Sequence, residues 1–139
     1  MIGRSVLVSE TKYIDSELME QMCHSMAVRF FDEKLEPIAS FKSHDQALLH
    51  SALELSKSMF GGKELYPTLV KKAAALYYSL IKNHPFENGN KRIATTTLLV
   101  FLKINDYWLK VGTEKLAQKA LVVSKSDPKD RDTVLNELE

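Results

Sequence analysis

The segment from His84 to Arg92 holds the residue types that could do chemistry on a charged substrate. It reads HPFENGNKR and combines a histidine, an acid, two amides and two bases. Because the imidazole of a histidine gains and loses a proton near neutral pH, His84 is the candidate general base for an attacking hydroxyl. Loops with this mixture of charges usually bind a ligand, since a structural connection does not need it.

The second half of this segment has the features of an anion site. A helix is expected to begin near Asn90, and its first turn offers unpaired backbone amides and the positive end of the helix dipole. Gly89 lets a ligand approach the backbone closely. Lys91 and Arg92 add positive charges that oppose the dipole unless an anion compensates them. These residues therefore predict a phosphate site.

The elements that must position this segment are helices, because apolar residues recur at three- and four-residue intervals. Two core helices are expected to flank it, one over residues 67–83 that starts at its proline, and one over 90–104 that is apolar or threonine nearly all round. Pro85 disfavours helical backbone at His84 and so predicts the break between them. Phe86, an apolar residue in a polar loop, is expected to anchor the loop in the core.

Further helices are expected around this pair. A first helix over about 15–31 precedes a second that opens with a capping box between Ser43 and Gln46. Two shorter helices follow, one capped by Thr113 and one capped by Asp127 with a proline at its first position. Residues 5–8 resemble a short strand with no identifiable partner. The residues expected to face inward are Leu18, Met22, Met26 and Phe30 in the first helix, and Leu116, Ala117, Ala120 and Leu121 in the helix capped by Thr113.

The composition is that of one globular domain, expected to span residues 1–139. Hydrophobic residues make up 45% and charged residues 27% of the chain, which is ordinary for a folded protein. A formal net charge of +1 gives no field that would favour nucleic acid or an anionic membrane. The apolar runs are too short for a signal peptide or a membrane span, so a cytoplasmic protein is expected. Cys23, the single cysteine, is expected to be a core residue.

The motif HPFENGNKR resembles the signature loop of the Fic and death-on-curing superfamily, H-x-F-x-[DE]-[AG]-N-[GK]-R. The similarity extends over about residues 44–107. It implies an all-α, Fic/Doc-type helical bundle with the signature loop between two core helices. It also implies a donor nucleotide, Mg²⁺ with ATP or another nucleoside triphosphate, and transfer to a hydroxyl of a protein. In this family His84 would be the base, and Asn90 and Arg92 would hold phosphates.

Two departures from the motif resemble the death-on-curing branch. Lys91 stands where adenylyl-transferring members usually have glycine, and Thr95 stands where their pattern has a further arginine. In that branch the nucleotide is thought to bind reversed, so that the γ-phosphoryl group is transferred. The resemblance therefore implies a toxin-like protein kinase, ranked above a protein adenylyltransferase of the same fold.

A third departure concerns the metal. Asn88 holds the acidic, metal-binding position of the motif, and an amide oxygen brings no charge to magnesium. The neighbouring Glu87 is the alternative source of a carboxylate. If neither binds the metal, the chain would be a catalytically weak nucleotide- or partner-binding module, which is the third function that the sequence leaves open.

Expectations about partners also follow from the resemblance. The stretch FGGKELYP, with Phe60, Gly61 and Gly62, resembles the flap that in the family holds the target segment beside the histidine. The death-on-curing branch implies a small antitoxin protein that folds onto the enzyme and a protein substrate, with a translation factor as the candidate. Neither a nucleic acid nor a membrane is expected as a partner.

Overall fold

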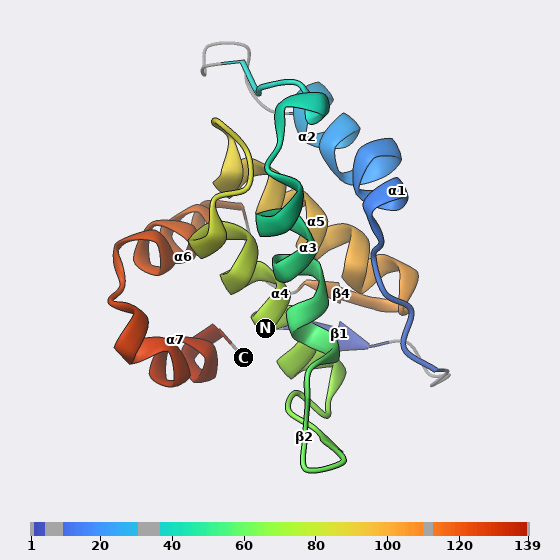
Figure 1. Ribbon diagram of the computed structural model, residues 1–139, viewed down its shortest axis with the longest axis vertical. Coiled ribbons are helices and arrows are strands. Elements are labelled where there is room, and N and C mark those ends of the chain that lie inside the picture. Colours follow the sequence, from blue (N-terminus) through green and yellow to red (C-terminus); the bar gives the residue numbers. More distant parts are fainter. Residues whose placement is uncertain (1, 5–9, 31–36, 110–112, 139) are drawn as a thin grey trace.

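The protein is mainly helical, which confirms the predicted all-α fold (Figure 1). The computed structural model describes residues 2–4, 10–30, 37–109 and 113–138. In chain order the elements are β1 (Ile2–Arg4), α1 (Ser16–Leu18), the π-helical η1 (Met19–His24), α2 (Ser25–Phe30), η2 (Phe41–Ser43), α3 (Gln46–Glu54), η3 (Leu55–Lys57), β2 (Met59–Phe60), β3 (Lys63–Glu64), α4 (Leu69–Asn83), α5 (Asn90–Ile104), β4 (Tyr107–Leu109), α6 (Thr113–Lys125), η4 (Pro128–Asp130) and α7 (Arg131–Leu138). Within these residues no helix is long and apolar enough to cross a membrane.

Helices α4 and α5 pack against each other at the centre, with α3, α6 and α7 around α4 (Figure 1). Helix α4 buries every residue from 72 to 81, because neighbours cover all its sides. Thr68 caps it by accepting a hydrogen bond from the Lys71 amide at 3.1 Å. The helix therefore begins after Pro67, and the prediction that it starts at the proline was wrong. Helix α5 begins at Asn90, as predicted.

The first helix runs through α1, η1 and α2, and its buried face differs from the predicted one. The buried apolar residues are Met19, Cys23 and Ala27, whereas Met22 is 39% exposed. Leu18 and Met26 are only half-buried, and the Phe30 side chain lies outside the described residues. Both stripes are apolar at four-residue spacing, and the small side chains of Cys23 and Ala27 allow closer approach to α5, against which η1 and α2 pack. Burial raises the pKa of the Cys23 thiol to about 11, so the thiol is a core group as predicted.

Asp45 is the N-cap of α3. Its Oδ1 accepts a hydrogen bond from the Leu48 amide at 3.0 Å. The predicted capping box was wrong, because Ser43 belongs to the preceding η2 turn and an aspartate directly before the helix satisfies the free amide.

Strands β2 and β3 form a hairpin after α3. Met59 lies opposite Glu64, and Phe60 lies opposite Lys63. The turn between them is Gly61–Gly62, with φ angles of 58° and 79°. Two successive left-handed residues make the tight turn that matches strand twist, which is why two glycines stand there. The hairpin projects from the end of the molecule where α4 begins (Figure 1).

The C-terminal helices cover one side of α4. Asp127 caps η4 ahead of α7, with Pro128 at its first position, as predicted. Ala120 and Val123 form the inner face of α6, whereas Leu121 is 48% exposed. The expectation that Leu121 faces inward was wrong. Ala120 and Leu121 are adjacent in the chain and therefore lie on different sides of α6, and only the side with Ala120 packs against the rest of the protein. The side chains of Thr113, Leu116 and Ala117 lie outside the described residues.

The short N-terminal strand does have a partner. β1 pairs antiparallel with β4, and Gly3 lies opposite Trp108. Residues 5–8, where the sequence suggested a strand, lie outside the described part of the chain. The pairing joins the start of the chain to the segment that follows α5.

Candidate functional site

The loop between α4 and α5 begins at His84 in an uncommon conformation. His84 ends α4 with φ 54° and ψ 53°, in the left-handed region, and its side chain is exposed. A residue other than glycine pays about 1–2 kcal/mol for this geometry. The surrounding structure must therefore hold it, which is typical of functional positions.

Asn90 holds the loop from the first turn of α5. Its Oδ1 accepts a hydrogen bond from the Phe86 amide at 3.0 Å, and its Nδ2 donates to the Phe86 carbonyl at 2.8 Å. Asn90 is only 6% exposed. Both polar groups of the side chain therefore serve the loop backbone, so the predicted contact of Asn90 with phosphate would fall mainly to its backbone amide.

Phe86 is 2% exposed and lies in the core, where the sequence analysis placed it. Its ring packs among those of His24, Phe41 and His44, with centroids 5.6 to 6.0 Å away. The neighbouring Pro85 carbonyl accepts a hydrogen bond from the Asp45 amide at 2.8 Å. These contacts fix the loop between its two helices.

Asn88 connects the loop to the segment over residues 37–39. Its Oδ1 accepts a hydrogen bond from the Ala39 amide and its Nδ2 donates to the Pro37 carbonyl, each at 2.6 Å. Gly89 follows with φ 74°, and a Cβ there would lie 2.8 Å from Cγ1 of Ile38. Asn88 therefore has a structural role, and glycine is required next to it both for its backbone angle and for the close approach of Ile38.

A pocket of about 460 Å³ opens where the ends of α4, α5 and α6 meet. It is lined by Ile81, Lys82, His84, Gly89, Asn90, Lys91, Arg92 and Ser124. The structure thus brings the candidate base and the predicted phosphate-binding residues together. A second pocket, of about 640 Å³ along α3, contains none of the residues singled out for chemistry.

The pocket is strongly positive. Lys82, Lys91 and Arg92 line it, and no aspartate or glutamate does so among the described residues. The N-terminus of α5 adds its dipole. Such a site suits a ligand with several negative charges.

Two polar lining residues, Lys82 and Ser124, were missed from the sequence. Lys82 lies in the last turn of α4, and its Nζ donates a hydrogen bond to the Ser126 carbonyl. In the sequence it resembles an ordinary helix-terminal lysine, although its place two residues before His84 was an available signal. Ser124 comes from α6, and no local pattern connects it with the loop.

The predicted metal ligands do not line the pocket. Glu87 is exposed beside it, and the Asn88 amide is bonded to backbone. The described residues contain no cluster of three histidine, cysteine, aspartate or glutamate side chains that could hold a metal ion. The donor set around the pocket therefore does not fit a magnesium ion held by protein carboxylates.

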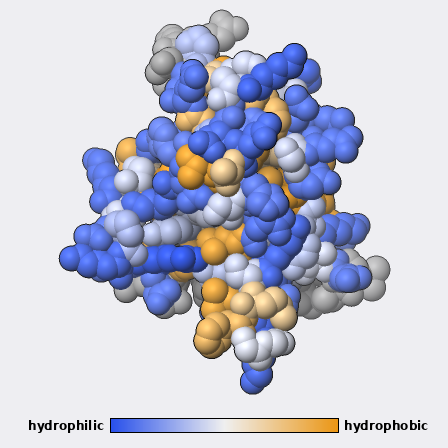
Figure 2. Space-filling model, in the orientation of Figure 1, coloured by the Kyte–Doolittle hydropathy of each residue, from blue (hydrophilic) through white to orange (hydrophobic). Residues whose placement is uncertain are grey.

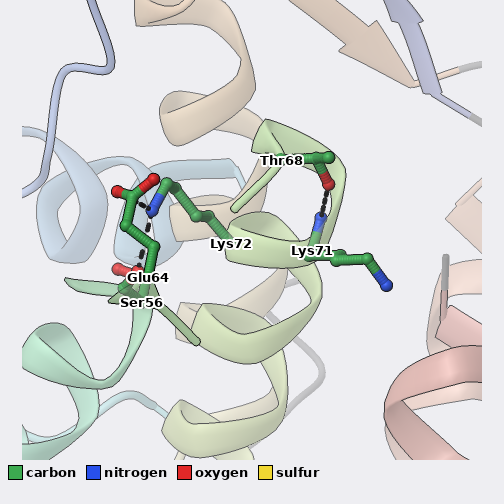
Figure 3. Close-up of polar contacts among 5 residues, drawn as sticks. All are labelled: Ser56, Glu64, Thr68, Lys71 and Lys72. Carbon is green, nitrogen blue, oxygen red and sulfur yellow. Dashed lines mark hydrogen bonds and ion pairs between the residues drawn. The ribbon is translucent and has the colours of Figure 1, made fainter. Parts of the chain in front are cut away.

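The hairpin that resembled a flap lies away from His84. Helix α4, whose fifteen residues give it a length of about 22 Å, lies between them. The hairpin lies beside the beginning of α4 (Figure 1), and His84 is the C-cap of that helix. Lys72 ties Glu64 of the hairpin to the first turns of α4 (Figure 3). The structure therefore does not bring Phe60, Gly61 and Gly62 into the lining of the pocket at His84, and a role for them in holding a target segment stays a prediction.

Comparison with known proteins shows the family to which the chain belongs. The model of the Fic/DOC family matches residues 12–102, which include the whole loop and most of the pocket. The chain belongs to the Fic/DOC family. The match ends before α6, so Ser124 lies outside the part of the chain that the Fic/DOC model describes.

One curated relative supports the resemblance to the death-on-curing branch. The chain is 42% identical over 64 residues to a protein named Toxin Doc from Mycolicibacterium smegmatis (strain ATCC 700084 / mc(2)155). The match covers 46% of this chain and 49% of that relative, so it spans about half of each. No solved structure matches the chain significantly.

Proposed function

We propose that this Fic/DOC protein is a transferase that moves a phosphoryl group from a nucleoside triphosphate, such as ATP, to a hydroxyl of a target protein. The observation that carries the proposal is the pocket itself. It joins an exposed histidine to three cations and the N-terminus of α5. A phosphate chain satisfies those positive groups, and a histidine at the edge of the pocket can receive a proton.

The reaction uses these groups as follows. The imidazole of His84 takes the proton from the attacking hydroxyl as a bond forms between its oxygen and the γ-phosphorus. The bond between that phosphorus and the bridging oxygen breaks, and the nucleoside diphosphate leaves with the electron pair. Lys91 and Arg92 stabilise the phosphate charges, and His84 then returns its proton to water. In such a reaction positioning and charge stabilisation supply most of the catalysis.

Phosphoryl transfer is favoured over adenylyl transfer by α5. Lys91 lines the pocket where adenylyl-transferring relatives usually have glycine. Thr95 does not line it, and its hydroxyl donates to the Lys91 carbonyl at 2.9 Å. No second arginine is therefore available at that position for an adenylyl group. The resemblance to Toxin Doc also supports a toxin-like role. A protein substrate such as a translation factor and a small antitoxin partner complete the proposal.

Radioactive transfer tests the proposal directly. The protein is incubated with a cell lysate and ATP labelled at either the γ- or the α-phosphate, and His84→Ala serves as the control. Label from γ-ATP on a protein band, absent with His84→Ala, supports phosphoryl transfer. Label from α-ATP instead supports the adenylyltransferase. If neither label is transferred although ATP binds, the alternative of a catalytically weak binding module is favoured, for which the structural role of Asn88 is the motivating observation.

A further inference from the structure

The pocket is lined by three cationic side chains and, among the described residues, by no carboxylate. We propose that it binds the polyphosphate chain of the nucleotide without a divalent cation held by the protein, and that Lys82 provides the third positive charge in its place. This inference rests on the proposed function, because it assumes a nucleotide in the same pocket.

The first argument is the set of available ligands. Magnesium in nucleotide sites is usually bound through one or two carboxylates together with the phosphates. Glu87 does not line the pocket, and both polar groups of Asn88 bind the backbone at Pro37 and Ala39. To reach a metal, Asn88 would have to give up the two contacts that join the loop to residues 37–39.

The second argument is repulsion. A magnesium ion in the pocket would lie among Lys82, Lys91 and Arg92, with no acidic side chain among the described lining residues to offset them. Like charges at short distance repel, and most strongly where water is partly excluded. The same three cations attract phosphate oxygens, so the pocket suits the bare polyphosphate better than its magnesium complex.

The third argument is the position of Lys82. Lys91 and Arg92 come from the first turn of α5, whereas Lys82 comes from the last turn of α4. Its ammonium is half-buried and is held toward α6 by the Ser126 carbonyl. An ammonium has three donors, so this contact leaves two for phosphate oxygens. A ligand in the pocket therefore contacts cations from two helices, α4 and α5. With a bound metal, the negative charge of the ligand would likewise be balanced from two sides, by the metal and by the first turn of α5.

Calorimetric titration of the whole chain with ATP tests the inference without measuring transfer. Wild-type protein is expected to bind ATP in EDTA at least as tightly as in excess magnesium. Lys82→Met should weaken ATP binding in EDTA roughly tenfold, as expected for the loss of a charge-assisted contact, and should weaken AMP binding less. Lys125→Met is the matched control, because Lys125 is exposed on α6 and does not line the pocket.

Two further variants separate charge from structure. Lys82→Arg keeps the charge and should retain most of the affinity for ATP. Lys82→Gln can still donate to the Ser126 carbonyl but lacks the charge, so it should weaken ATP binding as Lys82→Met does while thermal unfolding stays close to wild type. If Lys82→Gln binds ATP as tightly as wild type, the role of Lys82 is only to link α4 to the end of α6 through its hydrogen bond.

The remaining outcomes distinguish this inference from the proposed function. Binding of ATP only when magnesium is present overturns the inference and leaves the proposed transferase intact. If ATP does not bind with or without magnesium, both fail together. Binding in EDTA with no transfer in the labelling experiment supports the inference and contradicts the enzymatic function.

Discussion

The two ends of helix α4 use lysine in opposite ways. At its beginning, Lys72 is 2% exposed, and its Nζ lies 2.9 Å from Oε1 of Glu64 and 3.2 Å from the Ser56 carbonyl (Figure 3). The ring of Tyr13 lies below it, with the centroid 5.6 Å from Nζ. At the other end, Lys82 is bonded to a carbonyl and lines a pocket with two further cations.

The difference shows what distinguishes a structural cation, Lys72, from a cation that is proposed to bind a ligand, Lys82. Burial alone would lower the pKa of Lys72, but its hydrogen bonds to Glu64 and Tyr13 outweigh that effect and raise the pKa above its ordinary value. The charge of Lys72 is thus balanced within the protein. The charges around the pocket have no acidic side chain in its described lining, and in the proposed function the phosphates of the nucleotide balance them.

The hairpin end also differs in its surface. Met59, Phe60 and Leu65 are 58%, 83% and 51% exposed, and Figure 2 shows hydrophobic surface gathered over the hairpin. The pocket end presents charge instead. The proposed chemistry on a phosphate therefore belongs to the pocket end of α4, and the following substitutions test that division.

The largest effect is expected at His84. His84→Ala should lower the rate of transfer by about 10²–10⁴-fold, because the attacking hydroxyl loses its proton acceptor. The fold should persist, since the side chain is exposed. Initial rates with a labelled target and circular dichroism measure the two effects. His50→Ala, an exposed histidine on α3, should leave the rate unchanged, and equal rates for both variants would remove His84 from the mechanism.

Arg92→Ala should weaken ATP binding by roughly thirty- to a hundredfold, because a charged, two-pronged contact with phosphate is lost. The control is Arg29→Ala, since Arg29 is exposed on α2 and outside the lining of the pocket. Isothermal titration calorimetry gives both affinities. Unchanged affinity in Arg92→Ala would place the phosphate site elsewhere on the molecule.

Lys72→Met should behave in the opposite way from Lys82→Met. It should lower the free energy of unfolding by about 2–3 kcal/mol, because charge-assisted hydrogen bonds are lost and the buried Ser56 carbonyl loses a donor, while affinity for ATP stays at the wild-type value. Denaturant unfolding measures the first quantity. If Lys72→Met instead lost affinity for ATP and kept the wild-type free energy of unfolding, the two ends of α4 would not differ in the way described.

The same variant has a defined pH dependence. The pKa of Lys72 is raised in the folded state above the ordinary value of 10.5. Its contribution to stability is therefore complete below pH 10.5 and is lost as the pH rises through the folded-state pKa. The stability difference between wild type and Lys72→Met should be constant at lower pH and should narrow above pH 10.5.

The smallest effect is expected at Asn88. Asn88→Asp keeps an acceptor for the Ala39 amide but loses the donor to the Pro37 carbonyl, so it should cost about 1–2 kcal/mol of stability. Glu87→Gln, next to it and exposed, should be neutral. Thermal unfolding and transfer rates across a magnesium titration measure both variants. A rise in magnesium-dependent transfer in Asn88→Asp would show instead that this position faces a metal.

Local sequence signals predicted the parts of the site that depend on neighbouring residues. Pro85 and the Asn90 helix start located the break between α4 and α5, because proline restricts the residue before it. The local sequence signals gave the wrong buried face where two sets of apolar residues had the same spacing. The apolar stripe of Met22 and that of Cys23 have the same spacing, and only packing against α5 selected the second.

The sequence alone determined the helical fold, the break between α4 and α5 and the concentration of positive charge after Gly89, because these depend on residue type and on spacing along one or two turns. Only the tertiary structure decided which groups share the pocket. It brought Ser124 in from α6, bonded Lys82 to the Ser126 carbonyl, and bonded the amide of Asn88 to the backbone of residues 37–39. These outcomes depend on how separate helices pack, and contacts between residues forty or more positions apart leave no periodic signal in the chain.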